Sequence, residues 1–463
     1  MRKFRILKLF VLVAILAAAL VFVGMNFVQA QSQAKGKPDQ PPDKGGKPPK
    51  VECDNDGVCE SGEYDSRSSP ENQPCADCLP KIYPPLEIDQ TGVQIACAGL
   101  SFYYSSGKVY QFKYMNSEYQ DTWASDKIGV SWKNVSIGDV DNDGDKEITA
   151  LVNYFLREET SGKGKNKVTT RYYDQRIFIF ESGDGATTSK ASSYFGESTE
   201  TVTDTIIADV DNDGVKEFIL LKGKHFGSKH VEIYEWDGSD FVLDWPVFAD
   251  YEYNIFTLDV GDADNDTKNE LVLAMFDVGA PIIWKLSESG VWEETIAEII
   301  DVINSKAGYL GIDYTMVRDS DNDEMNEIVC GGNNYRLMIW EHNPGTEGYD
   351  STYISEDLGG CTEGIDVGDI NGDGDYEIVI GASMDTMYVF AYDGVTYNIV
   401  NSILVGGGFS GLVVSDIDYD GRDEIAAALQ GGLRIFDFIG NELLSGYLVE
   451  TYYSPYGGTL EIK

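Results

Sequence analysis

Six short acidic segments contain the side chains of this chain best suited to chemistry. Each spans nine residues, with a carboxylate or amide oxygen at positions 1, 3 and 5 and a glutamate at position 9. They align without gaps and begin at residues 139, 209, 262, 319, 369 and 416. The candidate ligands at positions 1, 3, 5, 7 and 9 are Asp139, Asp141, Asp143, Asp145 and Glu147; Asp209, Asp211, Asp213, Val215 and Glu217; Asp262, Asp264, Asp266, Lys268 and Glu270; Asp319, Asp321, Asp323, Met325 and Glu327; Asp369, Asn371, Asp373, Asp375 and Glu377; and Asp416, Asp418, Asp420, Arg422 and Glu424.

This spacing predicts calcium sites. Calcium takes six to eight oxygen ligands in a forgiving geometry. Carboxylates at positions 1, 3, 5 and 9 of a tight loop converge on one point, and the backbone carbonyl of position 7 and a water would complete the shell. Glycine at position 6 allows a left-handed backbone. Up to six calcium ions are therefore expected, each joining two strands of one hairpin.

The alternative is that Asp, Asn and Gly only form good turns. Six copies with the same spacing, all ending in glutamate, favour calcium. The loops are not equal, however, because Thr267 and Glu324 replace the position-6 glycine in two of them. Weaker or empty sites are expected there. In the fifth loop Asn371 keeps an oxygen but removes a charge.

The segments around the loops predict β-strands. A short apolar run precedes each loop, a stronger one follows, and alternating runs such as 176–180 and 230–234 come next. Alternation with β-branched and aromatic residues is typical of strands. Four strands in a repeat of about 50 residues indicate a blade of a β-propeller.

The two ends of the repeat region predict how the ring closes. Residues 94–99 align with residues 327–332, which form the second strand of a blade, and residues 457–463 lie where another first strand is due. We therefore expect an all-β, seven-bladed propeller over residues 86–463. Six blades are whole, and the seventh combines N- and C-terminal strands. The segment 157–168 is expected to be a mobile surface loop.

The loop pattern resembles a known family. Asp-x-Asp-x-Asp-Gly-x-x-Glu between short strands is similar to the calcium-binding repeats of the integrin α-subunit propeller and of microbial FG-GAP or VCBS repeat proteins. The sequences that give FG-GAP its name are absent, so the microbial branch is the nearer match. The resemblance implies a seven-bladed propeller, calcium on one face, and adhesion or recognition outside the cell. Some relatives are polysaccharide lyases or lectins.

Residues 1–80 predict export. Residues 1–30 begin with basic residues, continue with an apolar run and end in a cleavage-like Val-Gln-Ala, which indicates a signal peptide or a retained N-terminal anchor. Residues 31–50 form a Pro/Gly/Lys-rich linker. Residues 51–80 form a small Cys-rich module. The protein is therefore expected to be extracellular or at the cell surface.

Seven cysteines fit an oxidising compartment. Cys53, Cys59, Cys75 and Cys78 crowd into the small module, where a disulfide knot is favoured over a zinc or redox site. Cys330 and Cys361 lie on consecutive blades and form a further candidate disulfide.

Composition and the remaining motifs favour binding over catalysis. The net charge of −43 argues against nucleic acid as a partner. The three histidines have no metal-type spacing, and no nucleophile elbow or phosphate-binding loop is present. We interpret the chain as a calcium-stabilised module for adhesion, recognition or extracellular assembly, with a surface protein, a polysaccharide or another copy as partner. A carbohydrate-binding or lyase-like propeller and a sensory ectodomain on a retained helix remain as alternatives.

Overall fold

The computed structural model describes sixteen stretches of the chain, all within the compact unit Ile82–Lys463: 86–88, 95–99, 108–116, 118–126, 135–162, 167–183, 191–223, 229–251, 254–276, 279–297, 311–333, 335–382, 385–429, 432–439, 442–449 and 460–462. The predicted signal or anchor, the linker and the Cys-rich module, with Cys53, Cys59, Cys75 and Cys78, lie outside the described residues. Across the described stretches no helix could span a membrane.

The regular elements of the described residues are all β-strands, and they form seven four-stranded antiparallel sheets. Six sheets contain consecutive strands: β4 (Val135–Gly138), β5 (Glu147–Ser161), β6 (Val168–Phe180) and β7 (Ala191–Ser198); β8 (Thr201–Ala208), β9 (Glu217–Gly223), β10 (Lys229–Trp236) and β11 (Phe241–Tyr251); β12 (Ile255–Gly261), β13 (Glu270–Met275), β14 (Ala280–Leu286) and β15 (Trp292–Ile296); β16 (Tyr314–Arg318), β17 (Glu327–Gly331), β18 (Leu337–Asn343) and β19 (Gly348–Ile354); β20 (Thr362–Gly368), β21 (Glu377–Ala382), β22 (Thr386–Tyr392) and β23 (Tyr397–Leu404); and β24 (Phe409–Ser415), β25 (Glu424–Leu429), β26 (Gly432–Ile439) and β27 (Glu442–Val449).

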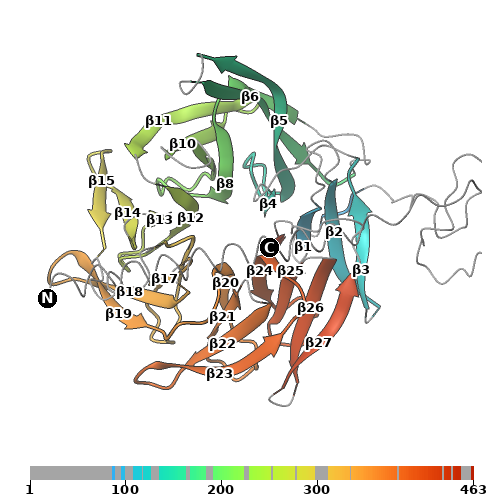
Figure 1. The fold of residues 1–463 in the computed structure, drawn as a ribbon, viewed down its shortest axis with the longest axis vertical. Helices are drawn as coiled ribbons and strands as arrows, with labels where there is room; N and C mark the ends of the chain where they lie inside the picture. Colours follow the sequence, from blue (N-terminus) through green and yellow to red (C-terminus); the bar gives the residue numbers. More distant parts are fainter. Residues whose placement is uncertain are drawn as a thin grey trace, which may run out of the picture. The chain divides into compact units, whose positions relative to one another are not determined.

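The sheets stand side by side around a ring, as a β-propeller requires (Figure 1). The first strand of each consecutive sheet contacts the first strand of the next, from β4 through β8, β12, β16 and β20 to β24. The second strands β9, β13, β21 and β25 are buried along their whole length because a sheet packs on each of their faces. This explains their nearly continuous apolar sequences.

The hydrophobic core lies between neighbouring sheets. One cluster joins Val140 and Leu151 of the β4–β7 sheet to Val202 and Phe218 of the β8–β11 sheet. Further clusters repeat this arrangement between each following pair of sheets. The core is therefore a set of layers arranged around the ring, and it holds the position of each first-to-second-strand loop.

The remaining sheet combines strands from distant parts of the chain. β28 (Leu460–Ile462) pairs with β1 (Ile95–Gly99), which continues to β2 (Lys108–Met115) and β3 (Glu118–Ala124). Ile95 lies opposite Ile462, and Cys97 lies opposite Leu460. β28 contacts both β24 and β4, which completes the ring. The predicted pairing of an N-terminal second strand with a C-terminal first strand is confirmed.

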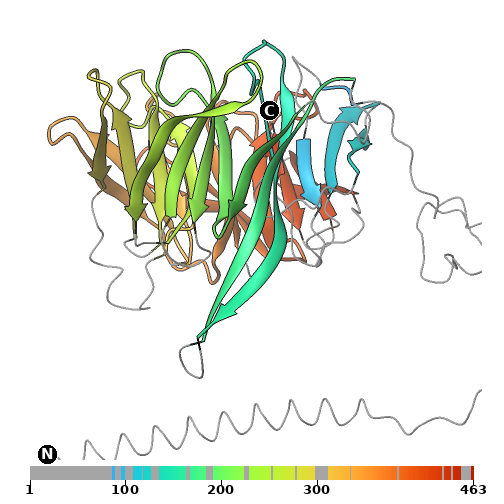
Figure 2. The ribbon, with the colours of Figure 1, turned by 90° about the horizontal axis from the view of Figure 1, so that it is seen from above.

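The expected mobile loop at 157–168 is instead largely a hairpin. β5 extends to Ser161 and β6 begins at Val168, so both strands project beyond the ring (Figure 2). Arg157 pairs with Glu159 at 2.9 Å and lies 4.0 Å from the ring centre of Tyr172. These side-chain contacts stabilise paired strands. The charged sequence of the segment had favoured a loop instead.

Candidate metal centres

All six acidic segments fold into the same compact loop between a first and a second strand. The carboxylate of position 1 accepts a hydrogen bond from the backbone N–H of position 6 in every loop, for example from Gly144 to Asp139 at 3.1 Å and from Thr267 to Asp262 at 2.8 Å. Position 6 has a positive φ in all six, including Thr267 at 77° and Glu324 at 70°. The predicted left-handed turn is confirmed.

Positions 2 and 9 attach five of these loops to the sheet below. The side chain at position 2 is buried, and its backbone N–H donates to the position-9 glutamate, as from Val140 to Glu147 at 3.0 Å and from Val210 to Glu217 at 2.8 Å. Glutamate at position 9 therefore begins the second strand and also holds the start of the loop. One carboxylate oxygen is used in this bond, and the other remains for a further partner.

In five loops the carboxylates of positions 1, 3 and 9 converge, and the expected ligand at position 5 joins them in only one loop among the described residues. One oxygen from each of positions 1, 3 and 9 lies within 4.8 Å of the others, and the described residues that form these groups are Asp139, Asp141 and Glu147; Asp209, Asp211 and Glu217, joined by Asp213; Asp262, Asp264 and Glu270; Asp319, Asp321 and Glu327; and Asp416, Asp418 and Glu424. Asp143, Asp266, Asp323 and Asp420 at position 5, and Asp145 at position 7, lie outside these groups.

The chemistry of these groups fits a hard divalent cation. One oxygen of a converged carboxylate in each of the five loops is buried and receives no hydrogen bond from any protein group; these residues are Asp139, Asp209, Glu270, Asp321 and Glu424. Burying a carboxylate without a partner is costly. An ion bound among the oxygens of positions 1, 3 and 9 would supply the missing interaction, and all-oxygen ligation is what calcium prefers.

The electrostatics of the loops point the same way. Burial raises the pKa of every position-9 glutamate to about 8, and neighbouring aspartates add to the shift; these residues are Glu147, Glu217, Glu270, Glu327, Glu377 and Glu424. Burial and the charges of Asp323 and Glu341 raise the pKa of Asp321 to about 6. The folded loops thus concentrate negative charge that only a cation or protons can offset.

The fifth loop departs from this arrangement. The amide nitrogen of Asn371 donates to Glu377 at 2.8 Å, and its oxygen accepts from the N–H of Asp373 at 2.9 Å. Its carboxylates Asp369, Asp373, Asp375 and Glu377 are not among the converged groups found in the described residues. The amide at position 3 therefore supplies a donor to one oxygen of Glu377, while the other buried oxygen of Glu377 receives no hydrogen bond.

Sequence reasoning missed a set of bonds between neighbouring loops. Asparagine at position 4 has a positive φ in four loops, and its side-chain oxygen accepts from the backbone N–H of position 8 in the next loop. The donor–acceptor pairs are Lys216 to Asn142, Asn269 to Asn212, Asn326 to Asn265, and Tyr376 to Asn322, at 2.7 to 2.8 Å. The alignment of the six segments shows that asparagine recurs at position 4. Its hydrogen-bond partner could not be predicted, because that partner lies in the next loop around the ring.

Where the fifth loop has Gly372 instead of asparagine, the link to the sixth loop is different. The carboxylate of Asp423 accepts from the N–H of Asp369 at 2.8 Å, and the N–H of Asp423 donates to the carbonyl of Asp369 at 2.9 Å. A Cβ at position 372 would lie 2.4 Å from the side chain of Arg422. Arg422 thus excludes a larger residue there.

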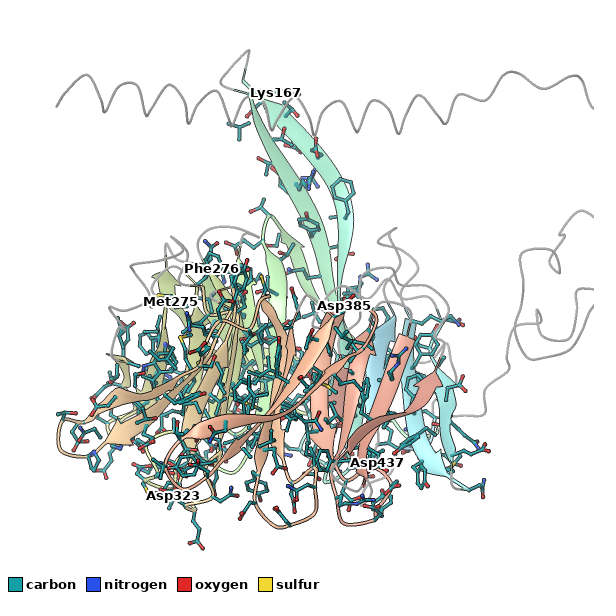
Figure 3. The ribbon with its side chains drawn as sticks, turned by 60° about the horizontal axis from the view of Figure 1, so that its bottom comes forward. Lys167, Met275, Phe276, Asp323, Asp385 and Asp437 are labelled. Carbon is teal, nitrogen blue, oxygen red and sulfur yellow. The ribbon has the colours of Figure 1, made fainter. Side chains whose placement is uncertain are left out.

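The acidic loops and the long hairpin lie at opposite faces of the ring. Asp323 of the fourth loop and Asp437 beside the sixth loop lie together at one face in Figure 3, while Lys167 at the hairpin lies beyond the other. Met275, Phe276 and Asp385 share the hairpin's side (Figure 3). The candidate ion sites therefore occupy a single face.

The candidate disulfide between Cys330 and Cys361 is not formed. No disulfide bond joins these two residues. The Cys330 thiol is buried in the core and donates to Thr315 at 3.4 Å, whereas the Cys361 thiol donates to Asn333 at 2.6 Å. Burial raises the pKa of Cys330 to about 12, so this thiol is inert. The prediction rested on the two cysteines lying on consecutive blades, and this does not show that their side chains contact different residues.

Comparisons with known proteins agree with this geometry. The sequence profile of the family described as FG-GAP-like repeat matches residues 319–380, which begin at the fourth loop and include the fifth. Residues 319–380 therefore form an FG-GAP-like repeat. The fourth and fifth loops lie within the matched segment. The other four loops have the same hydrogen bond from the N–H of position 6 to the carboxylate of position 1.

One solved structure is similar to this chain in fold. A protein from Lactobacillus plantarum is 11% identical, with a TM-score of 0.50 over 80% of this chain and 99% of that one. A chain of the mitotic checkpoint complex is 10% identical, with a TM-score of 0.45 over 71% of this chain and 84% of that one. No curated protein matches the sequence.

Proposed function

We propose that this chain is an FG-GAP repeat protein, a seven-bladed β-propeller that binds calcium in its acidic loops and acts outside the cell in adhesion, recognition or assembly. One observation carries the calcium assignment. Buried carboxylate oxygens that lack hydrogen-bond donors occur in all five loops whose ligands at positions 1, 3 and 9 converge. A cation is the partner that such a group requires.

Bound calcium would act on the fold by joining two strands of a sheet. Position 1 directly follows the first strand, and position 9 begins the second strand, so one ion contacts both. Without the ion the aspartates repel one another at short range. The loops link to their neighbours through position 4, so an ion in one loop also orders the adjoining loop.

The proposed extracellular location is compatible with calcium binding. Extracellular calcium modules bind the ion with dissociation constants of about 10⁻⁴ to 10⁻³ M, which suits a compartment where calcium is abundant. The basic and apolar segment at residues 1–30 supports export. The partner would be a surface protein, a polysaccharide or a second copy of the chain.

The first test is thermal unfolding of the purified protein with calcium and with a chelator. We expect calcium to raise the melting temperature and magnesium to do so less, because magnesium needs near-ideal octahedral geometry. Equal melting temperatures with calcium and chelator would contradict the proposed calcium binding.

The second test is retention and cleavage of a panel of extracellular polysaccharides. The proposed role predicts that no new chain ends appear. Calcium-dependent cleavage would instead identify a lyase or hydrolase, and retention without cleavage would identify a lectin. If no polysaccharide is retained, analytical ultracentrifugation with and without calcium tests self-assembly.

A further inference from the structure

The third loop contains a positive charge inside its carboxylate group. Lys285, on β14, donates hydrogen bonds to Asp264 and to Asp266, the latter at 2.6 Å, and its ammonium nitrogen lies 3.8 Å from an oxygen of Glu270. Its partners are thus positions 3, 5 and 9 of the loop, the same side chains that would ligate an ion. The ammonium group takes the place expected for a cation.

The strand register shows that this arrangement is specific to the third loop. Leu271 pairs with Trp284, so Glu270 and Lys285 face each other one residue further along the two strands. The strand registers of the other sheets give the residue opposite position 9 in the same way. These residues are Glu181, Glu235, Glu341, Ala391 and Asp437. Four of these positions add a carboxylate near the loop, whereas Lys285 adds a cation.

The backbone of the third loop is consistent with this role. Thr267 occupies position 6 with a φ of 77°, a conformation that a β-branched residue rarely adopts. The loop nevertheless keeps the hydrogen bonds from the N–H groups of Asp266 and Thr267 to Asp262, at 2.9 and 2.8 Å. An ammonium donor held by β14 stabilises the loop without any soluble ion.

We propose that the third loop does not bind calcium and that Lys285 is its permanent counter-ion. This inference rests on the calcium binding proposed for the other loops. Its consequence reaches the neighbours, because Asn212 of the second loop bonds to Asn269 of the third, and Asn265 of the third bonds to Asn326 of the fourth. The third loop therefore stays ordered without calcium and holds one side of each adjoining loop.

The test counts calcium ions bound per chain, by equilibrium dialysis with radioactive calcium. The full-length protein is compared with Lys285→Ala and with Lys285→Arg, which retains the charge. We expect Lys285→Ala to bind one more ion per chain than the unmodified protein, and Lys285→Arg to bind the same number. An unchanged count in folded Lys285→Ala would overturn the inference.

A reciprocal variant guards against misfolding of Lys285→Ala. Glu341→Lys places a lysine at the facing position of the fourth sheet, and we expect it to bind one ion fewer and to lose less of its melting temperature in chelator. An unchanged count with Glu341→Lys would also contradict the inference. If the unmodified protein binds calcium and neither variant alters the count, only this inference fails. If no chain binds calcium, the proposed function fails as well.

Discussion

The side-chain oxygen of Asn212 accepts a hydrogen bond from the backbone N–H of Asn269 at 2.7 Å, across the boundary between two sheets. The amide nitrogen of Asn212 donates in return to the carbonyl of Asn269 at 3.2 Å. The side-chain amide of Asn212 thus pairs with the backbone N–H and carbonyl of Asn269, as a backbone peptide group would. It joins the second and third acidic loops.

Asn212→Ala should weaken this link between the second and third loops. Two hydrogen bonds are lost, at about 1 kcal/mol each, so we expect a loss of about 1–2 kcal/mol in the free energy of unfolding. The calcium titration should also shift to higher concentration, because the second loop is less ordered before binding. Denaturant unfolding and isothermal titration calorimetry measure the two effects.

Asn343→Ala is the matched control for Asn212→Ala. Asn343 also makes two side-chain hydrogen bonds, with Gly345 and Asp350, but both lie within one hairpin. It should lower stability while leaving the calcium titration unchanged. If both variants titrate calcium like the unmodified protein, the loops do not communicate through the asparagines.

Glu217→Gln should remove one calcium ion. Glu217 belongs to the group in which four carboxylates converge, and its neutral amide offers one oxygen and no charge. At calcium 100-fold above the dissociation constant, one site contributes about 2.7 kcal/mol to stability. We expect Glu217→Gln to lose most of that contribution to the free energy of unfolding when calcium is present. In chelator, its stability should differ little from that of the unmodified protein. Glu288→Gln, at an exposed turn, is the control and should behave as the unmodified protein.

Position 6 of the loops can be tested in both directions. Gly214 has a φ of 92°, and a Cβ there would meet nothing within 4 Å, so Gly214→Ala isolates the backbone effect. We expect a loss of about 1 kcal/mol. Glu324→Gly should gain a similar amount because Glu324 already has a φ of 70°. Chemical denaturation measures the free energy of unfolding of both variants. If both substitutions destabilise the protein, the positive φ at position 6 does not explain the effects.

Glu232 should give the protein an acid-sensitive contribution to stability. Burial alone would raise the pKa of Glu232, but hydrogen bonds from His230 and Tyr234 and the charge of Lys222 outweigh it and lower the pKa to about 2. The unfolded chain has the ordinary value of 4.5. Stability from this carboxylate is therefore complete above pH 4.5 and is lost as the pH falls towards 2.

Glu232→Gln tests this contribution. Above pH 4.5 the variant should be less stable than the unmodified protein, and the difference should shrink as the pH falls towards 2. Unfolding free energies measured in chelator across this range separate the effect from calcium binding. A difference that stays constant with pH would show that packing, rather than the charge of Glu232, is responsible.

The loops could be predicted from sequence because their geometry is local. Position 6 bonds to position 1 and position 2 bonds to position 9, all within nine residues, so the repeated Asp139, Gly144 and Glu147 predict the folded loop. The strands followed from alternation for the same reason. The pairing of residues 95–97 with 460–462 was also accessible, because the repeats supplied an internal template.

The remaining features depend on register and on neighbouring sheets. Lys285 lies fifteen residues beyond Glu270, and only the pairing of Leu271 with Trp284 places it in the third loop. The partners of the position-4 asparagines belong to other repeats. Thr267 drew attention to the third loop for its backbone, although the stronger difference there is the lysine.

The pairing of β28 with β1 also bears on the order in which the chain folds. Six sheets combine neighbouring strands, and such short-range contacts form quickly. Ile95 and Ile462 meet only after the intervening chain has become compact, since closing so long a loop costs the most entropy. We expect a late intermediate in which the β1 edge is bare. Such an edge can pair with another molecule, so the final step of folding is also the one most exposed to strand exchange between chains.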